Sequence, residues 1–284
     1  MDKIAIVTDT NSGIPAHQAQ EMGIYLIPMP FFIDGETFLE GKDITADEFF
    51  DKMRAGADVS TSQPALTDIT GAWDEALKTH DKLLHFPMSS SLSGTCATAK
   101  ALAQEYNGRV LVVDDHRISI PLMVSILNAR VMIGRGMTAE EIRDALEAEG
   151  MSGVTIYISV NTLEYLKKSG RVTAAAAAMA SILGLKPVLQ IQGGKLDAFK
   201  KVRGMVHAKK AMFDALREDL RTRFAEEKVR VYCAYAGSKE LGRAWAEEVR
   251  AAFPDLYEDS MPLPLSICCH TGEGALGVGC VKVW

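Results

Sequence analysis

Residues 86–95 place five hydroxyl side chains in one short stretch of the sequence. The apolar segment 82–86 before it predicts a β-strand, and the alanine-rich segment 96–103 after it predicts a helix. Hydroxyls and unpaired backbone N–H groups would then gather at one helix N-terminus, which suits a phosphate or a carboxylate. Plain helix capping is the simpler interpretation, because Ser and Thr are favoured there. Since one hydroxyl is enough to cap a helix, four serines and Gly94 favour an anion site.

Two further polar loops occur earlier in the sequence. Residues 59–64 contain Thr61 and Ser62, and Asp9 directly follows an apolar run that predicts the first strand. Asp9 could bind a metal or orient a hydroxyl, while an Asx-turn at a strand end is its bland interpretation. These loops and that of Ser93 all follow strands or strand-like segments, and ligand sites of parallel α/β sheets lie beyond the carboxyl ends of strands.

A second group of candidate residues lies near the end of the sequence. His270 and Thr271 precede a literal G-x-G-x-x-G pattern. A dinucleotide site would need a following helix, a second strand and an acidic residue about 20 positions further on, but Trp284 is the last residue. We therefore expect these glycines to form a tight turn or to let the backbone approach a ligand closely. A lone histidine such as His270 is more often structural than functional.

Ser93 and His270 together would suit a serine hydrolase, with Asp9 as a guess for the third member. Against this alternative, the sequence contains no G-x-S-x-G nucleophile elbow. Arg171 and Arg203 each lie in a glycine-flanked turn. Most such arginines are solvated surface groups, and the alternative here is contact with a partner or a phosphate.

The composition excludes several classes of protein. The 284 residues allow one large or two medium domains, and 48% hydrophobic residues are enough for a core. A net charge of −6 without a dominant basic cluster disfavours nucleic acid as a partner. No apolar run reaches the roughly 20 residues that span a bilayer, and the N-terminus lacks a signal-peptide pattern, so we expect a cytoplasmic protein.

Cysteine usage points in the same direction. The chain has five cysteines, and Cys268 and Cys269 are adjacent, which suits reduced thiols better than a disulfide framework. No C-x-x-C or His–Cys spacing is present, so we predict no metal site, and no cofactor is implied.

The order of elements predicts an α/β fold in two domains. As far as Glu149, apolar strands alternate with helices, which is typical of a parallel, doubly wound sheet. The composition changes near residues 150–153. We therefore expect a Rossmann-like parallel domain over residues 1–152, which carries the Asp9, Thr61 and Ser93 loops, and an α+β domain with antiparallel strands over residues 153–284.

Three segments of the second half have distinct local patterns. Residues 188–192 and 196–202, joined by a turn at Gly193-Gly194, predict an antiparallel hairpin. Residues 161–167 predict a short helix. Residues 260–267 predict an extended segment interrupted by prolines.

Taken together, the motifs resemble those of the DegV family, whose members include the fatty-acid-binding subunit of bacterial fatty acid kinase. The resemblance runs from Thr8 to Gly279 in the family's order. The chain departs from the family pattern at residues 114–121, where the family tends towards Asp-Ser and a glycine-containing helix start, and at Ala65, where a Ser is frequent. The motifs that carry the resemblance are residues 8–10, 59–64, 89–95, 163–171 (LEYLKKSGR), 185–187 (LKP) and 270–274 (HTGEG).

The resemblance implies a bacterial lipid-binding protein that is not itself an enzyme. In this family pattern an acyl tunnel lies between two domains, and Thr61, Ser93 and His270 hold the fatty acid carboxylate. A separate ATP-dependent kinase then phosphorylates that carboxylate to an acyl phosphate, and transient contact with a membrane surface is implied as well. Arg171 and Arg203 match basic positions associated with kinase docking. The supporting residues are Asp9, Ser62, Gly94, Thr95 and Thr271.

The physical chemistry agrees with this expectation. A buried carboxylate costs several kcal/mol unless it is hydrogen-bonded, and two hydroxyls, an imidazole and a helix N-terminus offset that cost. About 15 buried methylenes, at about 0.8 kcal/mol each, contribute on the order of 10 kcal/mol. Another anionic lipid would satisfy the same chemistry.

Overall fold

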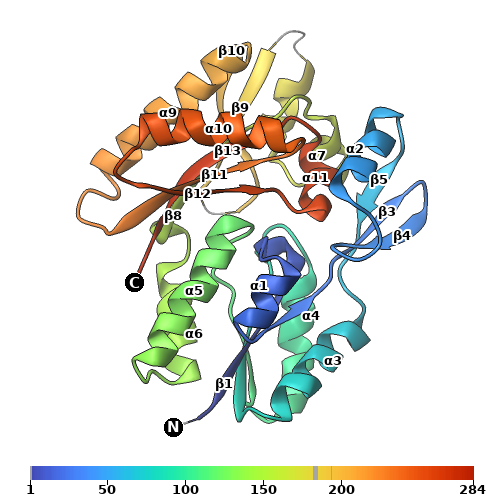
Figure 1. The fold of residues 1–284 in the computed structure, drawn as a ribbon, viewed down its shortest axis with the longest axis vertical. Coiled ribbons are helices and arrows are strands. Elements are labelled where there is room, and N and C mark those ends of the chain that lie inside the picture. Colours follow the sequence, from blue (N-terminus) through green and yellow to red (C-terminus); the bar gives the residue numbers. More distant parts are fainter. Residues whose placement is uncertain (1, 182–184, 193) are drawn as a thin grey trace. The chain divides into compact units, whose positions relative to one another are not determined.

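The computed structural model describes residues 2–181, 185–192 and 194–284, so Gly193 of the predicted Gly193-Gly194 turn lies outside the described residues. The chain divides into two compact units (Figure 1). Unit 1 comprises residues 1–45, 61–151 and Trp284, and unit 2 comprises residues 46–60 and 152–283. The predicted division after residue 152 differs from this in residues 46–60, which form α2 (Ala46–Arg54) and the start of β5 (Val59–Thr61) and belong to unit 2. It also differs at Ser152, which belongs to unit 2, and at Trp284, which belongs to unit 1.

Unit 1 is built on a four-stranded parallel sheet, as predicted, with the strand order β2-β1-β6-β7. Alternate side chains of each strand point to opposite faces of the sheet. Ala5 and Val7 pack with α3 and α4, whereas Ile6 packs with α1, α5 and α6. Helices therefore cover both faces of the sheet (Figure 1). The strands are β1 (Ile4–Asp9), β2 (Ile24–Ile27), β6 (Lys82–Phe86) and β7 (Val110–Val112). The helices are α1 (Ala16–Glu21), α3 (Leu66–Leu77), α4 (Thr95–Leu102), α5 (Ile120–Gly134) and α6 (Ala139–Glu149).

Two local features of unit 1 follow from the sequence. β3 (Pro30–Ile33) and β4 (Glu36–Leu39) form an antiparallel hairpin through Asp34-Gly35. Thr138 and Glu141 form a capping box at the start of α6, in which the side chain of each residue accepts a hydrogen bond from the backbone N–H of the other.

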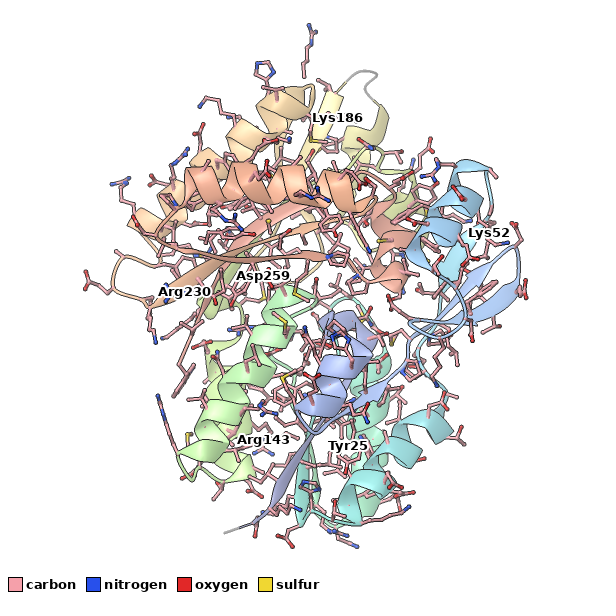
Figure 2. All side chains as sticks on the ribbon, in the orientation of Figure 1. Tyr25, Lys52, Arg143, Lys186, Arg230 and Asp259 are labelled. Carbon is pink, nitrogen blue, oxygen red and sulfur yellow. The ribbon has the colours of Figure 1, made fainter. Side chains whose placement is uncertain are left out.

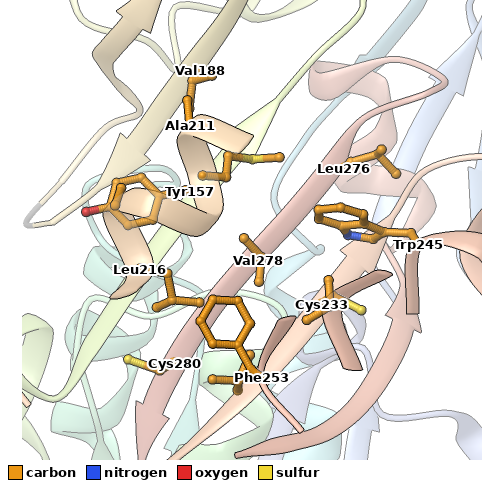
Figure 3. Packing of buried hydrophobic residues seen from close by; sticks show 14 of the residues in the cluster. Tyr157, Val188, Ala211, Leu216, Cys233, Trp245, Phe253, Leu276, Val278 and Cys280 are labelled. Atoms are coloured by element: carbon orange, nitrogen blue, oxygen red, sulfur yellow. The ribbon is translucent and has the colours of Figure 1, made fainter. Parts of the chain in front are cut away.

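Unit 2 contains a six-stranded sheet with the order β10-β9-β8-β13-β11-β12. Its neighbouring strands are antiparallel, as predicted, except for the parallel pair β11–β12. α9 (Met205–Arg221) and α10 (Lys239–Ala252) cover one face, where Trp245, Val278 and Leu216 form part of the core (Figure 3). The strands are β8 (Val154–Ser159), β9 (Leu185–Ile191), β10 (Asp197–Arg203), β11 (Val229–Tyr235), β12 (Tyr257–Pro262) and β13 (Leu276–Lys282).

Two predictions for unit 2 were wrong in detail. The segment predicted to be extended, 260–267, instead holds the end of β12 and the start of α11 (Leu265–Thr271). Pro264 is the N-cap residue of α11, because proline tolerates the start of a helix, where its missing N–H leaves no intrahelical bond unmade. The short helix predicted at 161–167 is α7, which begins later, at Glu164, and ends at Ser169. The first residues of the predicted helix, including Asn161, lie in the irregular segment between β8 and α7.

The cysteines and the helices of the described residues bear on the predicted redox state and on membrane insertion. All five cysteines are buried and free of disulfides. Within the described ranges, every helix is too short or too polar to span a lipid bilayer.

Candidate functional site

Asp9 connects the end of β1 to the serine-rich loop. Its Oδ1 accepts a hydrogen bond from the Asn11 backbone N–H at 2.9 Å, and its Oδ2 accepts one from Met88 N–H at 3.2 Å. The side chain is fully buried. Burial raises the pKa of Asp9 to about 6, although the two backbone N–H donors act in the opposite direction. Asp9 therefore positions the loop that begins at Pro87 and uses its carboxylate oxygens to do so.

The serine loop, residues 87–94, ends at the N-terminus of α4. The Ser93 hydroxyl lies 2.9 Å from the Thr95 hydroxyl and accepts the Thr95 backbone N–H at 3.2 Å. Gly94 is the N-cap residue and supplies no side-chain cap. Ser93 thus satisfies one of the donors that a helix N-terminus leaves unpaired, while its neighbours supply further hydroxyls within the same turn.

A third loop reaches the same helix. The Thr98 hydroxyl of α4 donates to Gln63 Oε1 at 3.0 Å, and a Cβ at Gly94 would lie 3.5 Å from that oxygen. Ser62 donates to the Gln63 carbonyl, and Thr61 is the last residue of β5, so the predicted polar loop starts as a strand. Within unit 1 the structure therefore brings the Thr61 and Ser62 segment to the first turns of α4, through Gln63.

A buried ionic network, which sequence reasoning missed, backs the serine loop. Arg117 is almost fully buried and donates to Ser125 Oγ at 2.9 Å and to Glu149 Oε1 at 2.7 Å. Its backbone carbonyl accepts from Ser89 N–H at 2.9 Å, and its backbone N–H donates to Asp115 Oδ1 at 3.2 Å. A buried charge is stable only when it is paired in this way. The network fixes the loop after β7, and that loop in turn holds Ser89.

The same loop contacts the serine segment a second time. The Ser90 backbone N–H donates to Asp114 Oδ1 at 3.3 Å, and its hydroxyl lies 3.3 Å from His116 Nδ1. The φ values of His116 and Ser119 are 60° and 55°, which non-glycine residues rarely adopt. These residues belong to the stretch 114–121 in which the chain departs from the family pattern. That departure, with two acids, a histidine and an arginine after a strand, is the signal that could have identified the network.

In unit 2, His270 lies in the last turn of α11. Burial lowers the pKa of His270 to about 4, and the positive charge of Arg171 lowers it further. The imidazole is therefore neutral at physiological pH. Thr271 donates to the Ile267 carbonyl of the same helix. The structure thus brings Arg171 into electrostatic range of His270, whereas Arg203 is the last residue of β10 and has Leu185 as its register partner.

The glycines after His270 serve close packing. Gly272 has a φ of 73°, and a Cβ there would lie 3.0 Å from the Tyr165 ring. At Gly274, with a φ of 82°, a Cβ would lie 1.9 Å from Asn161 Nδ2. β13 follows them in place of the helix that a dinucleotide fingerprint requires. At both glycines the group close to the backbone is a protein side chain, so the expected approach to a ligand stays a prediction.

Nothing supports the serine hydrolase alternative. The Ser93 hydroxyl bonds to Thr95, and Asp9 directs both carboxylate oxygens to backbone N–H groups. A triad would instead require the aspartate to orient a histidine. Among the residues that the structure describes, no group of three or more His, Cys, Asp or Glu side chains could hold a metal ion.

A cleft of about 370 Å³ lies at the opposite edge of the unit 1 sheet, near the amino ends of β1 and β2. None of the predicted site residues lines it. Its walls are mostly apolar, with Arg130 and His80 as the polar contributors. This cleft is therefore separate from the loops described above.

The chain is similar to proteins of one known family. A family model described as an uncharacterised protein of the DegV family matches residues 3–283. A DegV domain-containing protein of Deinococcus radiodurans is 33% identical over 281 residues, or 97% of either chain.

Two solved structures are similar over nearly the whole chain. A DegV family protein from Thermus thermophilus, described for its fatty acid binding, is 32% identical with a TM-score of 0.88, and the match covers 99% of this chain and 100% of that one. DegV from Bacillus subtilis, described as a fatty acid binding protein, is 26% identical with a TM-score of 0.85, at 99% and 100% coverage.

Proposed function

Because the chain belongs to the DegV family, we propose that it binds a long-chain fatty acid and presents the carboxylate to a separate ATP-dependent kinase. The observation that carries the proposal is the match, over 99% of the chain, to the Thermus thermophilus protein described for fatty acid binding. The proposed head-group residues are Thr61, Ser93 and His270, with Asp9, Ser62, Gly94, Thr95 and Thr271 in support.

The described geometry of unit 1 is compatible with a carboxylate site. Ser93 and Thr95 hold their hydroxyls 2.9 Å apart at the start of α4, where the helix dipole favours negative charge. Either hydroxyl can turn its proton to an incoming oxygen, because a hydroxyl both donates and accepts. The loop does not need to rearrange for this, since Asp9 and the Arg117 network already fix its backbone.

A neutral His270 suits the same task. With its pKa lowered to about 4, the imidazole contributes a hydrogen bond without a charge of its own. A bound carboxylate would stabilise the protonated ring and raise that pKa. Ligand binding is therefore expected to take up protons over the range above pH 4.

The second component of the proposal is the partner kinase. The sequence has no G-x-x-x-x-G-K-[ST] phosphate loop, so ATP would be bound by another protein. We assign Arg171 and Arg203 to the docking surface for that kinase. Because the ligand is so apolar, we also propose that it is exchanged during transient contact with a membrane surface. This role belongs in the bacterial cytoplasm, where ATP and fatty acid meet, and the acyl chain would occupy a buried tunnel.

Native mass spectrometry of the protein expressed in bacteria tests ligand binding directly. We expect an added mass that matches a long-chain fatty acid, lost on delipidation and restored by palmitate or oleate. Protein that carries no such mass and takes up neither acid would contradict the proposal. p-Nitrophenyl ester turnover that disappears in His270→Ala would instead favour a hydrolase.

The head-group assignment has its own test. Ser93→Ala combined with Thr61→Ala should weaken oleate binding at least tenfold, because it removes two donors to a buried anion. Thr70→Ala is the matched control, since the Thr70 hydroxyl bonds to the Leu66 carbonyl of its own helix. Equal dissociation constants for the double variant and the control would rule out this assignment.

A further inference from the structure

We propose that Asn161 is the positioning residue of the His270 loop, defined as residues 270–275, and that Lys186 sets the orientation of the Asn161 amide. This assignment gives a role to Lys186 of the LKP motif. The importance of the loop for a ligand rests on the proposed function, whereas the positioning itself does not.

The amide of Asn161 bridges two distant parts of unit 2. Its Nδ2 donates to the Glu273 carbonyl oxygen at 2.9 Å, and its Oδ1 accepts from Lys186 Nζ at 2.9 Å. These partners stand 112 and 25 residues away in the sequence. Lys186 projects from β9 (Figure 2), and its Nζ lies 3.4 Å from the Asn161 carbonyl oxygen as well.

The ammonium group decides which way the amide faces. Asparagine oxygen and nitrogen have nearly the same shape, so an amide can often be placed either way round. An ammonium carries only donors, and therefore Oδ1 must face Lys186. Nδ2 is then left to face the Glu273 carbonyl, and this arrangement satisfies both contacts where the reversed amide would satisfy neither.

Close packing makes this contact specific to one loop position. A Cβ on Gly274 would lie 1.9 Å from Asn161 Nδ2, so the amide occupies the space where a side chain would stand. On its other side the loop is tied to the end of β11, because Gly274 N–H donates to the Ala236 carbonyl at 2.7 Å. Glu273 also pairs with Arg54 of α2 at 2.5 Å. The Ala236 N–H also donates to the Ala275 carbonyl at 2.9 Å, so Asn161 closes a loop that is already held by three other contacts.

The hydrogen bond between Asn161 and Glu273 also limits the motion of His270, three residues earlier in the same loop. Gly272 and Gly274 have φ values of 73° and 82°, and glycine alone adopts such values readily. A chain with two such residues has wide conformational freedom unless its carbonyls are held. Loss of the bond to Glu273 would loosen the segment next to the last turn of α11, because the Glu273 carbonyl would no longer be held. The imidazole of His270 would then sample more solvent.

Asn161→Leu tests the assignment, because leucine has nearly the shape of asparagine and adds no charge that would itself shift a histidine. NMR titration of the imidazole, assigned with His270→Gln, should show the pKa of His270 rising by at least one unit from about 4. Oleate affinity should fall about tenfold. Gln18→Leu, which removes an exposed amide from α1 in unit 1, should change neither quantity.

Variants of Lys186 provide a second test, which holds even if Asn161→Leu does not fold. Lys186→Met should shift the His270 titration in the same direction by a smaller amount, and Lys186→Arg, which keeps a cationic donor, should restore it. An unchanged His270 titration in both Asn161→Leu and Lys186→Met would overturn the proposal. If the titration shifts while even the original chain binds no oleate, positioning stands and the proposed function fails.

Discussion

The serine loop of unit 1 and the His270 loop of unit 2 are held in place by different physical means. The first depends on buried ionisable residues, since Asp9 accepts hydrogen bonds from the backbone N–H groups of Asn11 and Met88, and the backbone carbonyl of Arg117 accepts one from Ser89. The second depends on missing volume, since Gly272 and Gly274 let Tyr165 and Asn161 approach the backbone. A loop held by charge should respond to pH, and a loop held by close contact should respond to added atoms.

The largest expected effect is steric and separates the two loops clearly. Gly274→Ala places a Cβ 1.9 Å from Asn161 Nδ2 at a φ of 82°, so we expect a loss of about 3 kcal/mol in the free energy of unfolding from overpacking and left-handed strain combined. Gly94→Ala in the serine loop meets only Gln63 Oε1, at 3.5 Å, and should change stability by about 0.5 kcal/mol or less. Urea unfolding of both variants measures the difference. Equal losses would contradict the contrast between the loops.

The same contrast shows what sequence could and could not predict. The strand at 82–86, the hydroxyl turn and the helix start were predictable, because a short apolar run and capping residues are local signals. Contacts between distant residues were not. Arg117 donates a hydrogen bond to Glu149, 32 residues away, and Asn161 donates one to the Glu273 carbonyl. No local sequence pattern predicts either contact.

The errors in unit 2 have the same origin. Pro264 and its neighbours suggested an extended segment, because prolines within an apolar run disfavour regular structure. Helix α11 instead starts directly after Pro264, and its residues from Leu265 to Cys269 are all buried. Tertiary burial thus decided a conformation that local propensity left open.

The next largest effect concerns His85 of β6, which leads into the serine loop. The side chain is fully buried, and among the described residues neither ring nitrogen has a hydrogen-bond partner. Burial lowers the pKa of His85 to about 3, from 6.5. The unfolded chain therefore binds the proton more tightly, so the contribution of a neutral His85 is complete above pH 6.5 and is lost as the pH falls towards 3.

His85→Leu should remove this sensitivity to acid. Between pH 7.5 and pH 5, the original chain loses about 2 kcal/mol through His85, and the variant should not. The variant should also be more stable at pH 7.5, because no buried nitrogen is left unsatisfied. Urea unfolding at the two pH values checks both statements. His80→Leu, at a partly exposed histidine, is the control. A variant that loses as much stability at pH 5 as the original chain would show that His85 is not the source.

The smallest effect has the opposite sign and arises in the same unit. The pKa of Asp9 is raised from 3.8 to about 6 by burial, so the folded state holds that proton more tightly than the unfolded state does. Its stabilising contribution is complete below pH 3.8 and is lost as the pH rises through about 6. From pH 7.5 to pH 5 the original chain should gain about 1 kcal/mol through Asp9. Asp9→Asn should abolish this gain.

The two titrations partly cancel in the original chain, which is why single variants are needed to reveal them. Asp9→Asn should make the chain more sensitive to acid than the original, and His85→Leu less sensitive, although both residues belong to unit 1. Asp68→Asn, at an exposed aspartate of α3, is the control for removing a carboxylate. The His270 loop is held by close contact and by the neutral amide of Asn161, so Asn161→Leu should alter the difference in stability between pH 7.5 and pH 5 only through the pKa of His270. A rise of one unit from about 4 lessens the loss of stability at pH 5 by about 0.4 kcal/mol. An acid response altered by about 1 kcal/mol or more in Asn161→Leu but unaltered in Asp9→Asn would reverse the assignment of ionisable groups to one loop and of close contact to the other.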